Sequence, residues 1–87
     1  MPTVIVHHEV RDFDAWKQVF DSVKDMRSQN GEKSATVYRG AENKNMLSIV
    51  MDWESVDSAH KYLGSDELKG AMGQAGVLGA PSVFITE

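Results

Sequence analysis

The stretch NMLSIVMDW, residues 45–53, has an apolar side chain at every second position: Leu47, Ile49, Met51 and Trp53. A period of two is that of a β-strand, because successive side chains of a strand point to opposite faces of the sheet. The intervening positions mix apolar and polar side chains. We therefore predict a strand with one fully apolar face, which helices should cover.

Three other segments have the composition of strands. TVIVHHEV (3–10) and KSATVYRG (33–40) are rich in β-branched residues, and SVFITE (82–87) follows Pro81. The polar segment GAENKN (40–45) is short enough to join the second and third strands as a hairpin. We expect these strands to add the following residues to the face beneath the helices: Val4, Val6, Ala35, Val37, Val83 and Ile85.

Helices are predicted between the strands. In residues 13–30 an apolar stripe recurs at steps of three and four from Phe13 to Arg27, with Asp12 as N-cap and Gly31 after the end. Ser55 and Ser65 are expected to cap two shorter helices separated by Gly64. The order β-α-β-β-α-β, with a split second helix, predicts an α+β, ferredoxin-like fold with a four-stranded antiparallel sheet. We expect residues 1–87 to form one domain.

Composition excludes several classes of protein. The chain of 87 residues has a formal net charge of -4 with scattered cations, which argues against nucleic acid and anionic membranes as partners. It has no cysteine and no apolar run long enough to cross a bilayer, so we expect a cytoplasmic protein.

A chain this short has a thin core. The second sheet face is also apolar and predicts a homodimer packed sheet to sheet through Ile5, Thr36, Tyr38, Met46, Val50 and Phe84.

Two segments, VRDFDAWKQVFD (10–21) and DWESVDSAHKYLGSDELKGAM (52–72), resemble the dimeric α+β barrel superfamily. The similarity is to its small antibiotic-biosynthesis-monooxygenase-like members. It lies in Trp53, Glu54-Ser55, Ala59, Tyr62-Leu63, Ser65 and Leu68-Lys69. The resemblance implies a homodimer whose two sheets form a barrel, with a cleft between sheet and helices in each subunit.

Three positions depart from the heme-degrading branch of that superfamily. Met72 stands where that branch has its iron-ligating histidine, Tyr62 where it has a tryptophan, and His8 nearest to its first-strand asparagine. The resemblance therefore implies an enzyme without heme. We expect no metal or other cofactor, and we expect Met72 and Tyr62 to contact a substrate in the cleft.

The histidines are the candidate bases. His60 shares a predicted helix face with Val56, Ala59 and Leu63, so we expect it to point inward. A buried neutral imidazole could accept a phenol proton, although a packed core histidine has the same pattern. His8 is expected on the helix side near the end of its strand. His7 and Glu9 share the other face, where zinc binding would need a third ligand that the sequence does not show; a hydrogen bond across the dimer is the other interpretation.

Two functions remain open. The first is a cofactor-independent monooxygenase-like or isomerase-like enzyme for an aromatic or polyketide-like molecule, with His60 or His8 as base and Trp16 and Trp53 as walls. The second is a non-catalytic dimeric barrel that binds a small apolar or aromatic ligand or serves a structural role. The glycine-rich residues 70–80 are predicted to be loosely wound, either as a lid or as a connector.

Overall fold

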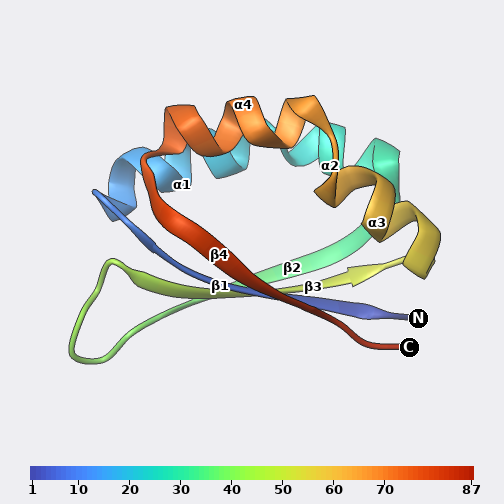
Figure 1. Ribbon diagram of the computed structural model, residues 1–87, viewed down its shortest axis with the longest axis horizontal. Coiled ribbons are helices and arrows are strands. Elements are labelled where there is room, and N and C mark those ends of the chain that lie inside the picture. Colours follow the sequence, from blue (N-terminus) through green and yellow to red (C-terminus); the bar gives the residue numbers. More distant parts are fainter.

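The computed structural model describes residues 1–87 and contains eight elements. These are β1 (Thr3–Val10), α1 (Phe13–Ser22), α2 (Lys24–Asn30), β2 (Glu32–Arg39), β3 (Met46–Trp53), α3 (Val56–Leu63), α4 (Asp66–Ala75) and β4 (Val77–Ile85). The strands form one antiparallel sheet in the order β2-β3-β1-β4, and all helices lie on one face of it (Figure 1). This confirms the predicted ferredoxin-like α+β fold. No helix is both long and apolar enough to cross a lipid bilayer.

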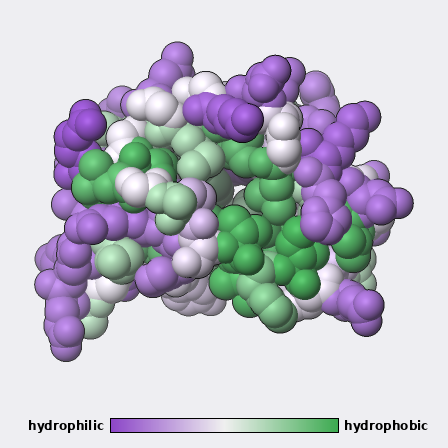
Figure 2. Space-filling view, viewed as in Figure 1, coloured by the Kyte–Doolittle hydropathy of each residue, from purple (hydrophilic) through white to green (hydrophobic).

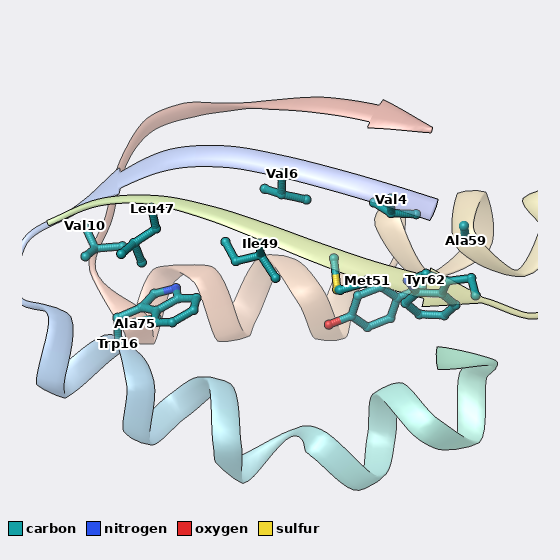
Figure 3. Packing of buried hydrophobic residues seen from close by; sticks show 11 residues of the cluster. Val4, Val6, Val10, Trp16, Leu47, Ile49, Met51, Ala59, Tyr62 and Ala75 are labelled. Atoms are coloured by element: carbon teal, nitrogen blue, oxygen red, sulfur yellow. The ribbon is translucent and has the colours of Figure 1, made fainter. Parts of the chain in front are cut away.

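The core lies between the helices and the two central strands. Val4 pairs with Met51 and Val6 with Ile49 across β1 and β3, so that these side chains share the face beneath the helices (Figure 3). The whole predicted apolar face of β3 is buried, and Trp53 and Leu47 are fully buried. Burial of alternate residues on both central strands makes the register definite, because a slip by one residue would expose the entire set.

The predicted caps hold the helices in place. The Asp12 side chain accepts a hydrogen bond from the Ala15 backbone N–H, and Ser55 and Ser65 do the same for the third residue of α3 and α4. Gly31 ends α2 in the left-handed conformation at φ 119°. The prediction of one continuous helix over residues 13–30 is wrong, because the backbone leaves helical geometry at Val23, where φ is -103° and ψ is 15°. The chain therefore bends around the interior.

The last strand begins five residues before the predicted start at residue 82. β4 includes Pro81, which a strand tolerates here because β4 lies at the edge of the sheet and Pro81 faces a register shift opposite His8. Residues 70–80 are accordingly not a loose connector. They continue α4 to Ala75, turn at Gly76 with φ 76°, and enter β4.

The second face of the sheet is uncovered in this single chain (Figure 1). Its large apolar side chains include Tyr38, 58% exposed, and Phe84, 63% exposed. The prediction that helices cover all strands on the opposite face is wrong at the edges, because Ala35 on β2 and Val83 on β4 remain exposed. The helix layer is thus narrower than the sheet.

A buried ion pair joins α2 to β2. Arg27 Nε donates to Glu32 Oε2 at 2.7 Å, and both side chains are almost completely inaccessible to solvent. Arg27 also donates to the Phe20 backbone carbonyl and stacks over the Phe20 ring, with its guanidinium carbon 3.7 Å from the ring centre. Glu32 itself adjoins the turn at Gly31. The pair thereby holds the bend between α1 and α2 against the first residue of β2.

Removing one member of this pair should destabilise the fold far more than removing both. Arg27→Met leaves the Glu32 carboxylate buried without a partner, which costs about 3–5 kcal/mol of unfolding free energy. The double variant Arg27→Met/Glu32→Met should recover most of that loss. Urea unfolding of the three proteins measures both effects, and equal stabilities for the single and double variants would contradict the prediction.

Candidate functional site

A cavity of about 300 Å³ lies between the sheet and the helices. Its floor comes from β1 and β3, and its walls come from α1 and α4. Apolar side chains surround a hollow between α4 and β4, where the cavity opens (Figure 2). Of the 18 lining residues 14 are hydrophobic, so the few polar groups decide what chemistry is possible there.

His8 is the polar group on the floor of the cavity. It lies on the helix side of β1, as predicted, because it alternates in phase with Val4, Val6 and Val10, and it is only 8% exposed. The Trp16 ring meets it edge-on, with 5.9 Å between ring centres. No protein group lies within hydrogen-bonding distance of either ring nitrogen of His8. A buried polar group in this state costs about 1–3 kcal/mol, and a ligand in the cavity could supply the missing hydrogen bond.

The surroundings of His8 favour its neutral form. Burial lowers its pKa from the ordinary value of 6.5, and the charge of neighbouring His7 lowers it further. Neutral imidazole has one nitrogen that donates and one that accepts a hydrogen bond. His8 can therefore accept a proton from a bound acid at neutral pH.

Tyr62 lies at the other end of the cavity. It is 4% exposed and packs on Trp53, with 5.0 Å between ring centres and 32° between ring planes. In Figure 3 its hydroxyl points along the interior and away from Ala59. Burial raises the pKa of this hydroxyl, with Arg27 acting in the opposite direction, so the group stays a protonated donor. Tyr62 thus offers a hydrogen bond to a ligand.

Of the three remaining residues predicted to contact a substrate, two line the cavity and one does not. Trp16, stacked on Phe20 at 4.8 Å, and Met72 on α4 both line it, as expected for contact residues. Trp53 does not reach it: its ring is fully buried behind Tyr62, and its indole N–H has no partner. The expectation that Trp53 forms a wall is therefore wrong.

The prediction that His60 points inward, as a candidate base in the cavity, is wrong. It is exposed on α3 and does not line the cavity, because the buried face of this short helix passes through Ala59 and Tyr62. Arg27 and Lys69 line the cavity and were missed. The one signal for Arg27 was its place at the end of an apolar helical stripe.

The zinc hypothesis for His7 and Glu9 finds no third ligand. His7 Nδ1 and Ser48 Oγ are 2.9 Å apart, and Asn43 Nδ2 donates to Glu9 at 3.1 Å. No group of three or more histidine or carboxylate side chains gathers anywhere in the chain. Both residues are engaged with neighbours on the open sheet face.

The fold is shared with several solved structures. A proposed antibiotic biosynthesis monooxygenase from Bordetella bronchiseptica superposes with a TM-score of 0.84 at 15% identity, over 99% of this chain and 94% of that one. SnoaB, a cofactor-independent oxygenase from Streptomyces nogalater, superposes with a TM-score of 0.76 at 14% identity, over 99% and 92%. A conserved protein from Methanosarcina mazei Go1 gives 0.76 at 17%, over 98% and 89%.

These similarities confirm the predicted resemblance to antibiotic-biosynthesis-monooxygenase-like proteins at the level of the fold. No family sequence model matches the chain, and no curated protein is similar to it in sequence.

The lowered pKa of His8 makes the fold sensitive to mild acid. Below about pH 6.5 the unfolded chain binds a proton at His8 that the folded chain does not, so the free energy of unfolding falls with falling pH. Between pH 7.5 and 5.5 this contribution reaches at most about 1.4 kcal/mol. Urea unfolding at the two pH values should show a smaller drop for His8→Asn than for the natural protein. Equal drops would contradict the prediction.

Proposed function

We propose that this protein is a small monooxygenase-like enzyme that needs no cofactor and acts on an aromatic, polyketide-like molecule bearing an acidic hydroxyl. The observation that carries the proposal is His8: a buried imidazole with both nitrogens free of protein partners, at the floor of an apolar cavity. The shared fold with SnoaB, described as a cofactor-independent oxygenase, supports the same class of reaction.

His8 supplies the proton acceptor. A phenol or enol within reach of the neutral imidazole loses its proton to it, and the resulting anion is delocalised onto ring carbon. The apolar walls exclude water, which makes this carbon more reactive toward dioxygen. In the overall reaction a ring CH₂ group and O₂ give a carbonyl and water: one oxygen atom enters the substrate, and the other leaves with the two hydrogens. The four electrons needed come from the substrate carbon.

Trp16 and Tyr62 orient the substrate in this scheme. Trp16 presents an aromatic surface beside His8, and the Tyr62 hydroxyl offers a hydrogen-bond donor at the far end of the cavity. A planar ring system lies between them, held by packing on Val6, Ile49 and Met72. The same contacts would serve the non-catalytic alternative, binding without turnover, and only an activity measurement separates the two.

Turnover should depend on His8 and not on His60. With a hydroxylated anthrone as substrate, His8→Asn should lower kcat/KM by about 10²–10⁴-fold, since a general base is lost while the buried volume is largely kept. His60→Asn is the matched control, because that side chain is exposed outside the cavity. Oxygen consumption and quinone absorbance measure the rate. Full activity of His8→Asn, or no turnover by the natural protein, would contradict the proposal.

We also propose that the active form is a homodimer joined through the open sheet face. Only 16 of the 87 residues are buried in the single chain, so the fold gains from further apolar burial. The open face offers exposed Tyr38 and Phe84 beside half-buried Ile5 and Val50. A patch of this kind on a sheet is typical of an interface, and a second copy presents a complementary surface of the same shape.

Sedimentation equilibrium at micromolar concentration tests the dimer. The natural protein should have twice the mass of one chain, and Tyr38→Lys/Phe84→Lys should be a monomer because four cations would meet in the interface. His60→Lys, which adds a cation on an exposed helix position, should stay dimeric. A monomeric natural protein would overturn the dimer.

A further inference from the structure

The charges that line the cavity are all of one sign. Arg27 and Lys69 belong to the lining, and no aspartate or glutamate does. The chain as a whole has the opposite bias, with 13 acidic and 9 basic residues. The positive charges of the lining contrast with the acidic bias of the chain, and a lining cation without a protein partner would favour a ligand that carries negative charge.

Only one of the two cations is free to pair with a ligand. Arg27 already donates to Glu32 at 2.7 Å and to the Phe20 carbonyl, so its charge is balanced within the protein. Lys69 is exposed and forms no ion pair. It lies on α4 and is one of the residues that line the cavity. Lys69 is therefore the one lining cation that is both exposed to solvent and without a protein partner.

We propose that the ligand is an apolar acid: a ring system that fills the cavity and carries a carboxylate that pairs with Lys69 at the mouth. This inference rests on the proposed function, since it concerns the substrate of the same cavity. Because Lys69 stays accessible to water, the carboxylate keeps part of its hydration and the pair forms without the large desolvation cost of a buried pair. Lys69 becomes a residue that determines specificity.

The position of Lys69 also sets the orientation of the ligand. Ala75 lies six residues further along α4, about 9 Å along the helix axis at 1.5 Å per residue. Ala75 belongs to the same buried cluster as Trp16, which contacts His8 (Figure 3). A ligand held at Lys69 by its carboxylate therefore extends its opposite edge toward His8. The charged end anchors the molecule, and the far end is the one presented to the base.

Binding of 2-naphthoate and its neutral counterpart 2-naphthamide tests this assignment. The natural protein should bind the acid roughly two- to fivefold more tightly, as expected for one ion pair with a solvent-exposed lysine. Lys69→Gln should lose that preference while its affinity for the amide is unchanged. Lys44→Gln, which removes the same charge from the exposed β2–β3 turn, should keep it. Calorimetry at low and high salt measures the affinities, and the preference should weaken with salt.

The outcomes separate the two proposals. Equal binding of acid and amide by the natural protein, or an acid preference that survives Lys69→Gln, overturns the apolar-acid assignment and leaves the role of His8 intact. An acid preference that depends on Lys69, with no turnover of any hydroxylated ring substrate, supports the assignment and overturns the oxygenase. If neither probe binds, the cavity is not a site for aromatic acids, and this assignment fails.

Discussion

The alternation of side chains along β1 is the constraint on which the rest of the structure depends. Val4, Val6 and Val10 are buried beneath the helices, and a strand cannot bury them without also turning His8 to the same side. The same alternation turns His7 to the open face, where it contacts Ser48. Two adjacent histidines thus enter different environments: one loses its hydration and its tendency to be charged, and the other keeps both solvent and a polar neighbour. A shift of one residue in the pairing of β1 with β3 would exchange them and expose the core.

The cavity follows from how the helices meet this face. The bend at Val23, held by the Arg27–Glu32 pair, turns α2 away from the line of α1. On the other side α4 contributes small side chains, Ala71 and Ala75, to the lining of the cavity. Neither helix can fill the space above Val6 and Ile49. Few residues of this chain are buried, and an unfilled cavity of this size leaves its lining without packing contacts that would stabilise the fold. For this reason we regard the cavity as a candidate site.

Sequence patterns predicted most of the fold and about half of the site. Where they succeeded, the reason was the strict alternation of side chains along the strands. Strand alternation is strict over eight residues, so the inward direction of His8 and of the β3 face could be derived from the sequence. A helix of eight residues is less decisive. The stripe through Val56, Ala59 and His60 and the stripe through Ala59, Tyr62 and Leu63 both satisfy helical spacing, and the packing of Tyr62 on Trp53 selects the second. Residues 70–80 were misjudged because glycine propensity was given more weight than tertiary contacts, which keep α4 helical to Ala75 and pair residues 77–85 with β1.

The polar groups of the cavity differ in their exposure to solvent, and the proposed chemistry depends on this difference. His8 is removed from solvent, so it favours the neutral form that can accept a proton. Lys69 remains in contact with solvent at the mouth, so it keeps the charge that can attract an anion at little desolvation cost. If the two positions were exchanged, a buried lysine would bind the charge of an acidic ligand in an apolar interior, where no water solvates that charge. An exposed histidine would compete with solvent for the proton of the substrate. In the proposed scheme, the difference between an exposed lining residue on α4 and a dry floor at β1 would let one small cavity bind by charge at one end and transfer a proton at the other.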